Sequence, residues 1–336
     1  MSLPNASIAV IGAGSWGTAL AVLLSRNGQS TLLWARDAQK IATMEQARCN
    51  QRYLPDIGLP PALTLSADLT AVVHSCEDLL VVVPSHAFRS TLESMQPLVR
   101  TGQRLAWATK GFEPRTCKLL HEVVADVFGE ELATAVVSGP TFAKEVAKGL
   151  PTAVTVASKS ESFAGDLARR LHDETFRAYT SDDVVGVEVG GCVKNVLAIA
   201  AGIADGLGFG ANTRAALITR GLVEIMRLGD ALGGHRETFM GLAGLGDLVL
   251  TCTDNLSRNR RFGLAMGQGL GKEDALASID QVVEGMQAAR EVHNLATRFG
   301  VEMPIAEQVF EVLYEDKSPR EAVHDLLARQ QKAETF

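Results

Sequence analysis

Three closely spaced glycines near the N-terminus constrain the fold of this chain more than any other feature of its sequence. Gly12, Gly14 and Gly17 form a Gly-x-Gly-x-x-Gly pattern. The pattern follows an apolar run at residues 7–11 that predicts a buried strand, and helical spacing of apolar residues continues over 15–27. A strand, a tight glycine turn and a helix in that order are typical of the first unit of a doubly wound α/β sheet.

Each glycine has its own steric task in such a turn. Gly12 permits the tight bend, Gly14 lets the backbone approach a pyrophosphate, and Gly17 lets the helix pack closely on the strand. The N–H groups and the positive dipole end at the start of the helix attract the anion. The segment therefore predicts a dinucleotide site, and the alternative is a glycine-rich turn that binds nothing.

The residues after the second predicted strand, at 31–34, indicate which dinucleotide binds. An NAD site usually has Asp or Glu there, about 20 residues past the glycines, to bind the ribose 2′-hydroxyl. This chain has Arg36 instead. A guanidinium suits a 2′-phosphate by charge and bidentate geometry, so NADP(H) is favoured. A surface arginine at a helix start is the alternative, and Asp37, the predicted N-cap of the next helix, keeps NAD(H) open.

Strand-like and helical segments alternate as far as residue 180. Further strands are predicted by short apolar runs at 79–83, 105–109, 133–137, 153–157 and 176–179. A loop is predicted by Pro55, Gly58, Pro60 and Pro61. This alternation predicts a mostly parallel sheet with helices on both faces.

The pattern changes after Asp183, where no strand-like run of β-branched residues remains. Long apolar stretches at helical spacing follow at 184–204, 211–232, 281–299, 305–314 and 320–330. We therefore expect a Rossmann-type dinucleotide-binding domain over residues 1–183 and an all-helical substrate and catalytic domain over residues 184–336.

The composition is ordinary for a soluble two-domain protein. The 336 residues are 46% hydrophobic and 21% charged, enough apolar material for a large core. Five dispersed cysteines without Cys-x-x-Cys predict a reducing cytoplasm, and the histidines show no metal-ligand spacing. The net charge of −7 argues against a nucleic-acid partner. Residues 1–25 carry no charge, but they lack the basic start of a signal peptide, so neither secretion nor a membrane span is expected.

Lys194 is the only charged residue between Glu188 and Asp205, on a helix that is otherwise apolar all round. Such a helix is buried, and an ammonium on it needs a partner or a task. Burial is expected to lower its pKa and to equip it for proton exchange near neutral pH. Reduction of a ketone by hydride needs such a proton donor for the developing alkoxide. The alternative is a structural ion pair.

Three further features are candidates for ligand contacts. Lys110 ends a predicted strand at the carboxyl edge, where ligands of doubly wound sheets bind; a solvated loop lysine is the alternative. Asp247 is isolated in the apolar, glycine-rich segment 241–253. Positive charge and hydrogen-bond donors are concentrated in Ser257, Arg258, Asn259, Arg260 and Arg261. That cluster suits a phosphate or carboxylate, and a solvated basic helix start is its alternative.

Together, these residues and motifs resemble the bacterial-type glycerol-3-phosphate dehydrogenases that use NAD(P). The resemblance extends from about residue 7 to about residue 330. Its ordered segments are 12–19, 80–85, 107–111, 138–145, 190–196, 206–213, 242–253, 257–263, 282–285 and 303–304. Each segment is a weak signal alone, but their order makes them specific jointly.

The resemblance implies the reversible reduction of dihydroxyacetone phosphate to sn-glycerol 3-phosphate, which supplies glycerophospholipid biosynthesis, with Lys194 as the catalytic acid/base. Besides the three glycines, the residues implied to contact the cofactor are Ser15, Trp16, Arg36, Lys110, Ala143, Arg258, Val282 and Glu284, with Tyr53 as a further candidate. The residues implied to surround the substrate are Lys110, Gly139, Thr141, Lys194, Asp247, Ser257, Arg258 and Asn259.

Two other functions stay open at this point. A related dehydrogenase acting on a hydroxy acid, ketopantoate or a sugar acid would share the fold, but a neutral substrate has no need of the Arg258 cluster. A regulator that senses NADPH would need no proton donor such as Lys194. A homodimer is expected by analogy with helical domains of this architecture.

Overall fold

The computed structural model describes residue 3, residues 6–279 and residues 281–330. The chain divides into two compact units. We name the first the sheet unit; it contains the chain up to Glu113 and the segment Lys118–Val184. The second, the helical unit, contains Pro114–Cys117 and the chain from Val185 onward. All five cysteines are free thiols.

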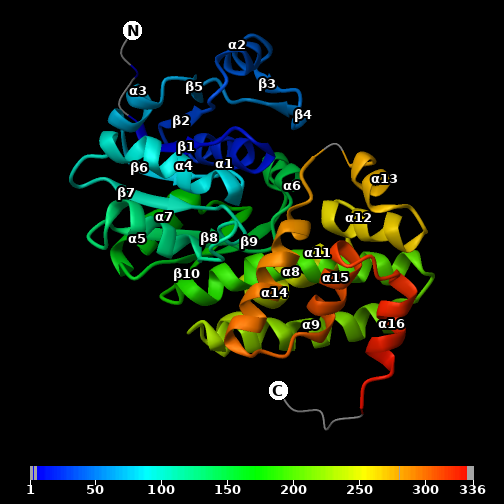
Figure 1. The fold of residues 1–336 in the computed structure, drawn as a ribbon. Coiled ribbons are helices and arrows are strands. Elements are labelled where there is room, and N and C mark those ends of the chain that lie inside the picture. The colour runs from blue at the N-terminus through cyan, green and yellow to red at the C-terminus, as the bar shows by residue number, and fades with distance from the viewer. Residues whose placement is uncertain (1–2, 4–5, 280, 331–336) are drawn as a thin grey trace. The chain divides into compact units, whose positions relative to one another are not determined.

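The sheet unit is built on eight strands in the order β10-β9-β8-β7-β6-β1-β2-β5 (Figure 1). Their bounds are β1 Ala6–Ile11, β2 Thr31–Trp34, β5 Thr64–Ser66, β6 Cys76–Val81, β7 Arg104–Trp107, β8 Thr134–Ser138, β9 Thr152–Ala157 and β10 Phe176–Ser181. Neighbouring strands are parallel except for the antiparallel pair β8–β9. The predicted mostly parallel sheet is therefore confirmed.

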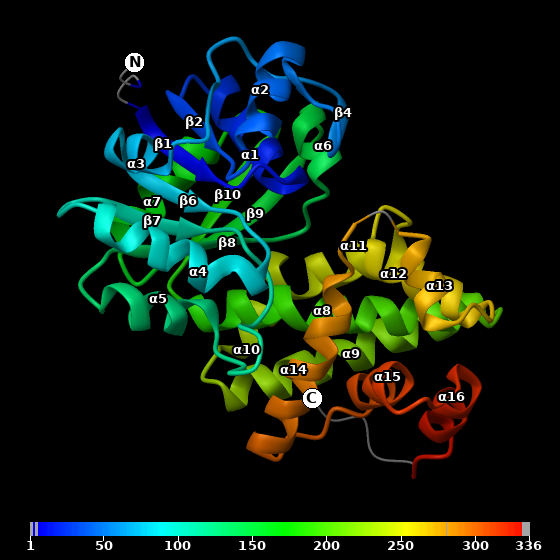
Figure 2. The same ribbon diagram turned by 45° about the horizontal axis from the view of Figure 1, so that its top comes forward.

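Helices cover both faces of this sheet (Figures 1 and 2). Their bounds are α1 Ser15–Arg26, α2 Ala38–Ala47, α3 Leu69–His74, α4 Ser85–Met95, α5 Leu120–Phe128, α6 Ala143–Lys148 and α7 Glu161–Leu171, with a 3-10 turn at Gln96–Leu98. The apolar residues of α1 and α7 share one core with alternate residues of the strands, such as Ile8 and Val10 of β1. The strand order runs in opposite directions from β1, through β2 on one side and β6 on the other, so the glycine turn after β1 lies at the switch point of the sheet.

The predicted loop at Pro55–Pro61 is wrong in part. Residues Leu54–Gly58 form β4, which pairs antiparallel with β3 at Cys49–Asn50. Within the described ranges β4 pairs with β3 alone, and a proline is tolerated on an edge strand because no second neighbour needs its missing N–H. β5 is likewise too short for its apolar pattern to identify it as the edge strand beside β2.

The helical unit contains helices and no strand among the described residues, as predicted. Their bounds are α8 Val184–Gly206, α9 Ala211–Ala231, α10 Arg236–Phe239, the π-helical turn η2 Leu242–Gly246, α11 Asp247–Thr253, α12 Arg258–Gly267, α13 Lys272–Ala277, α14 Glu284–Phe299, α15 Pro304–Tyr314 and α16 Pro319–Leu327. The five long apolar stretches correspond to α8, α9, α14, α15 and α16. The short helices α10 to α13 lie in the glycine- and polar-rich segments between them.

α8 is the central helix of this unit. By length and composition alone it could cross a membrane, but 94% of its most apolar window is buried inside the structure, as in the core helix of a soluble protein. Its backbone touches that of α12: a Cβ on Gly202 would lie 2.1 Å from the carbonyl oxygen of Arg260, and one on Gly263 would lie 2.1 Å from that of Ile199. These glycines therefore set the spacing between the two helices that carry Lys194 and Arg258.

Candidate active site

The glycine turn has the geometry that a dinucleotide site requires. Gly12 has a φ of +121°, and its N–H donates to the carbonyl oxygen of Trp34 at 3.0 Å. A Cβ on Gly12 would lie 2.4 Å from the carbonyl oxygen of Val82, and one on Gly17 would lie 1.9 Å from that of Gly12. A Cβ on Gly14, in contrast, would meet no heavy atom within 4 Å. The middle glycine thus borders open space, whereas the other two are confined by backbone.

The start of α1 beside this turn is suited to an anion. Gly14 is the N-cap, and no side chain caps the helix. The indole Nε1 of Trp16 is buried and donates to no partner among the described residues. Such an orphaned donor fits an acceptor group of a ligand. The residues present therefore fit a dinucleotide, with Ser15 at the first position of the helix.

The residues predicted to contact the ribose follow β2 directly. Arg36 is exposed. The Asp37 carboxylate accepts from the N–H groups of Gln39 and Lys40 at 2.9 and 3.1 Å, so it is used as the cap of α2. Tyr53 is half-buried, and the Lys40 ammonium lies 4.6 Å from the centroid of its ring.

Two residues that the sequence patterns did not indicate support the glycine turn. The carbonyl oxygen of Ala13 accepts from Lys40 Nζ at 2.5 Å and from Asn50 Nδ2 at 3.1 Å. The spacing of Lys40 and Asn50 in the sequence does not mark them as partners of the glycine turn. Lys40 comes from the face of a helix, and Asn50 comes from a two-residue strand.

Lys110, Gly139 and Thr141 lie close together in the sheet unit, past the carboxyl ends of β7 and β8. The carbonyl oxygen of Gly139 accepts from Lys110 Nζ at 3.1 Å and from the Thr141 hydroxyl at 3.2 Å. Gly139 has a φ of +154°, and a Cβ there would lie 3.0 Å from the carbonyl oxygen of Ala153. Ala143 follows as the first residue of α6 and is half-buried.

Lys194 is buried on α8 and has a carboxylate partner. Its Nζ donates to Asp247 Oδ1 at 2.5 Å and to the Thr251 hydroxyl at 3.0 Å. The Thr251 hydroxyl donates in turn to the main-chain oxygen of Asp247 at 2.6 Å. Lys194 is 7% exposed and Asp247 only 1%. The carboxylate and the hydroxyl hold the Lys194 side chain in place, an arrangement common to a positioned proton donor and a structural ion pair.

A second chain of hydrogen bonds begins beside Lys194. Asn259 Nδ2 donates to Asn195 Oδ1 at 2.9 Å, and Asn259 Oδ1 accepts from the Gly285 N–H at 2.9 Å. The sequence patterns did not indicate Asn195 or Thr251. The available signal was their place in the sequence, since Asn195 directly follows Lys194 and Thr251 lies four residues after Asp247. The chain joins α8, α12 and the start of α14, where Glu284 is half-buried and Val282 is 54% exposed.

The arginines of the basic cluster have different partners. Arg258 is half-buried and donates to Gln281 Oε1 at 3.2 Å. Arg260 is buried and donates to the carbonyl oxygen of Cys252, to Asn255 and to Asp205. The cluster is therefore not a single anion site, because the Arg260 guanidinium is already used within the core. Ser257 is the N-cap of α12, and its hydroxyl accepts from the Arg260 N–H at 3.2 Å.

No group of three or more His, Cys, Asp or Glu side chains in the described ranges could hold a metal ion. The candidate groups are the glycine turn and Lys110 in the sheet unit, and Lys194 and Arg258 in the helical unit.

Comparison with known proteins identifies the family. Two family models match the chain: "NAD-dependent glycerol-3-phosphate dehydrogenase N-terminus" over residues 7–164 and the corresponding "C-terminus" over residues 183–324. The chain belongs to the NAD(P)-dependent glycerol-3-phosphate dehydrogenase family. It is therefore an oxidoreductase of that family, and the expected resemblance is confirmed.

Individual relatives agree over nearly the full length. Glycerol-3-phosphate dehydrogenase (NAD(P)+) of Aeromonas hydrophila is 58% identical over 329 residues, 98% of each chain. The crystal structure of glycerol-3-phosphate dehydrogenase from Coxiella burnetii superposes with a TM-score of 0.93 at 51% identity, covering 96% of this chain and 99% of that one. A ketopantoate reductase from Ralstonia eutropha, at 17% identity and a TM-score of 0.59 over 95% of this chain and all of that one, shares the fold alone.

Proposed function

We propose that this chain interconverts dihydroxyacetone phosphate and sn-glycerol 3-phosphate, that it prefers NADPH as reductant, and that Lys194 is the proton donor. The observation that carries the proposal is the buried Lys194 ammonium, 2.5 Å from the Asp247 carboxylate in a protein of this family. The bound dinucleotide supplies a hydride to the carbonyl carbon. All other steps belong to side chains of the protein.

Lys194 would act on the carbonyl oxygen of the substrate. As the carbonyl is reduced, negative charge develops on this oxygen, and the ammonium stabilises the charge and gives it a proton. In the reverse reaction the neutral amine takes the proton from the hydroxyl. Asp247 orients the ammonium, and the Thr251 hydroxyl accepts its second hydrogen bond.

The substrate phosphate is assigned to the start of α12. Arg258 supplies a guanidinium there, and Ser257 and Asn259 flank it. The positive end of a ten-residue helix adds to the attraction. In the sheet unit, Lys110, Gly139 and Thr141 are the proposed substrate contacts. A neutral substrate would leave Arg258 without this task, which favours a phosphorylated one.

The cofactor is assigned to the glycine turn and α1. Ser15 and Trp16 would contact it at the helix start, and Arg36 would bind the 2′-phosphate that distinguishes NADPH from NADH. The remaining proposed contacts are Gly12, Gly14, Gly17, Tyr53, Lys110, Ala143, Arg258, Val282 and Glu284. Residues 1–183 thus form the proposed dinucleotide-binding domain and residues 184–336 the proposed substrate domain.

We place the enzyme in the cytoplasm as a homodimer that supplies glycerophospholipid biosynthesis, without a nucleic-acid partner.

A turnover assay with a Lys194 variant tests this function. NADPH absorbance is followed with dihydroxyacetone phosphate, with unphosphorylated dihydroxyacetone, and with NADH in place of NADPH. Lys194→Met should lower kcat by about 10²–10⁴, the span of general acid catalysis, while NADPH still binds. Near-normal turnover by this variant would refute the role of Lys194. If the unaltered chain binds NADPH but reduces neither ketone, the protein is a sensor and not a dehydrogenase.

A double variant separates catalysis from folding. Lys194→Met alone strands the buried Asp247 carboxylate, which costs about 3–5 kcal/mol of stability. Lys194→Met with Asp247→Leu removes both charges, and the replacement of a buried ion pair by apolar side chains is often neutral for stability. We expect the double variant to fold and to remain inactive. A folded double variant with normal kcat would leave the ion pair without a chemical role.

A further inference from the structure

The main-chain oxygen of Ala13, in the middle of the glycine turn, is held by two side chains from different elements. Lys40 Nζ, from α2, donates to it at 2.5 Å, and Asn50 Nδ2, from β3, donates to it at 3.1 Å. Asn50 is buried and also donates to the Thr18 hydroxyl of α1 at 2.8 Å. Two donors therefore converge on the Ala13 oxygen. They tie it to α2 and β3 directly, and Asn50 links it to α1 as well.

The oxygen belongs to the peptide group that also contains the N–H of Gly14. A trans peptide is planar, so its C=O and its N–H point in opposite directions. Fixing the Ala13 oxygen on Lys40 and Asn50 therefore directs the Gly14 N–H away from both side chains. The space beside Gly14 is open, since a Cβ there would meet no heavy atom within 4 Å.

The surroundings of Lys40 are positively charged. The Lys40 ammonium and the Arg52 guanidinium lie 4.6 and 5.4 Å from the centroid of the Tyr53 ring. Burial and the charge of Arg52 lower the pKa of Lys40, and Asp37 acts in the opposite direction. The Asp37 carboxylate is itself engaged by the N–H groups of α2. The positive charges of Lys40 and Arg52 would therefore attract an anion bound beside the glycine turn.

We propose that Lys40 and Asn50 are positioning residues of the dinucleotide site, which hold the Ala13–Gly14 peptide so that its N–H faces the cofactor pyrophosphate. This inference rests on the proposed place of the cofactor at the glycine turn. The pyrophosphate is common to NADPH and NADH. Loss of either donor must therefore weaken both cofactors by the same factor, unlike loss of Arg36, which would act on the 2′-phosphate alone.

Equilibrium binding of NADPH and of NADH to the purified full chain, followed by the fluorescence of the reduced nicotinamide, tests the proposal. Lys40→Met should weaken both cofactors by up to about 10–100-fold, the effect of losing the charge-assisted hydrogen bond from the Gly14 N–H to the pyrophosphate, and leave the ratio of the two Kd values unchanged. Lys40→Arg, which keeps a charged donor, should restore most of the affinity. Lys159→Met is the matched control, because Lys159 is an exposed lysine of the same unit, and it should change neither Kd.

A double-mutant cycle tests whether both side chains act on the same oxygen. Asn50→Leu removes the second donor with a side chain of similar size. If Lys40 and Asn50 hold one carbonyl, the combined loss in Lys40→Met/Asn50→Leu will be smaller than the product of the two single losses. The Tm of each variant without cofactor reports the fold, and Lys40→Met, at a half-buried position, is the variant expected to retain it.

Two results would overturn the inference. One is a folded Lys40→Met variant that binds both cofactors as tightly as the unaltered chain. The other is a loss confined to NADPH, which would make Lys40 a reader of the 2′-phosphate instead.

Gly14→Val tests the underlying cofactor site separately. Its side chain enters the open space beside the turn, so it should abolish binding of both cofactors while the Tm stays unchanged. Normal binding by Gly14→Val would refute the cofactor site itself. Loss in Gly14→Val without loss in Lys40→Met would refute only the positioning role.

Discussion

Burial distinguishes two arginines that are close neighbours in the sequence. Arg258 and Arg260 lie on the same helix, but Arg260 is buried and donates to Asp205, whereas Arg258 is half-buried and contacts Gln281. A charged side chain that is fully paired in the core has no donors left for a ligand. The Asp37 carboxylate caps α2 through Oδ1 alone.

Arg36, in contrast, is exposed at the end of β2, and its variant tests the choice of cofactor. Arg36→Ala should raise the Kd for NADPH by about 10–100-fold, as expected for a lost charge-assisted contact. The Kd for NADH should change little, because NADH has no 2′-phosphate. Arg177→Ala, at an exposed arginine of β10, is the control. Equal losses for the two cofactors would show that Arg36 does not read the phosphate.

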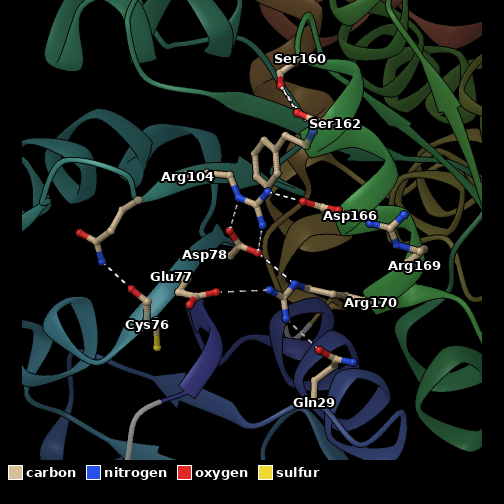
Figure 3. Close-up of polar contacts among 12 residues, drawn as sticks. Gln29, Cys76, Glu77, Asp78, Arg104, Ser160, Ser162, Asp166, Arg169 and Arg170 are labelled. Carbon is tan, nitrogen blue, oxygen red and sulfur yellow. Dashed lines mark hydrogen bonds and ion pairs between the residues drawn. The ribbon is translucent and has the colours of Figure 1, made fainter.

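At the scale of secondary-structure elements, a buried carboxylate joins two strands and a helix of the sheet unit (Figure 3). Asp78, near the start of β6, accepts from Arg104 Nε of β7 at 2.6 Å and from Arg170 Nε of α7 at 3.0 Å. Arg104 also donates to Asp166 of α7 at 2.6 Å. The network lies toward the amino ends of β6 and β7, away from the carboxyl ends that carry Lys110.

Asp78→Asn should therefore lower stability without weakening NADPH binding. Asp78 is 1% exposed, and its loss leaves two guanidiniums without their buried partner. Breaking such a pair costs about 3–5 kcal/mol, and we expect the lower end because the Arg104 and Arg170 side chains are 23% and 19% exposed. Urea unfolding measures the loss. Asp166→Asn, at a carboxylate that is 34% exposed, should cost about 0–1 kcal/mol. Equal losses in the two variants would contradict this account.

At the scale of the whole molecule, a buried carboxyl group links stability to pH. Glu224 of α9 accepts from the N–H groups of Ile305 and Ala306 at the start of α15, at 2.7 and 3.0 Å. Burial raises its pKa to about 8, although both N–H groups and the charge of Arg227 act in the opposite direction. The ordinary value is 4.5. The folded state thus binds this proton more tightly than the unfolded state.

The contribution of Glu224 to the free energy of unfolding is greatest below its ordinary pKa of 4.5. It is lost as the pH rises toward about 8. Thermal unfolding near pH 5 and near pH 8.5 should therefore show a smaller fall in Tm for Glu224→Gln than for the unaltered chain. Each kcal/mol corresponds to about 2–4 °C for a domain of this size. Glu307→Gln, at an exposed glutamate of α15, is the control and should behave like the unaltered chain. An equal fall in all three would show that the two N–H groups keep Glu224 charged throughout.

Much of the architecture followed from short-range patterns. The apolar runs predicted seven of the strands that the sheet contains, and the long helical stretches predicted α8, α9, α14, α15 and α16. Periods of two and 3.6 residues record which side of an element is buried, so they are readable without the fold. β3, β4 and β5, of two, five and three residues, were missed because they are too short or too rich in proline and glycine to carry a period.

The sequence by itself determined the glycine turn, the isolation of Lys194 and the change to an all-helical region at residue 184. Only the tertiary structure decided which side chains meet. Asp247 lies 53 residues beyond Lys194, Asn259 lies 64 beyond Asn195, and Asn50 lies 37 beyond Ala13. Local spacing in the sequence indicates that a lysine is buried. It does not identify the partner of that lysine, because a hydrogen bond needs its donor and acceptor at a defined distance and angle. That partner is chosen by how closely the helices and strands pack, as where the glycines of α8 and α12 bring two backbones into contact.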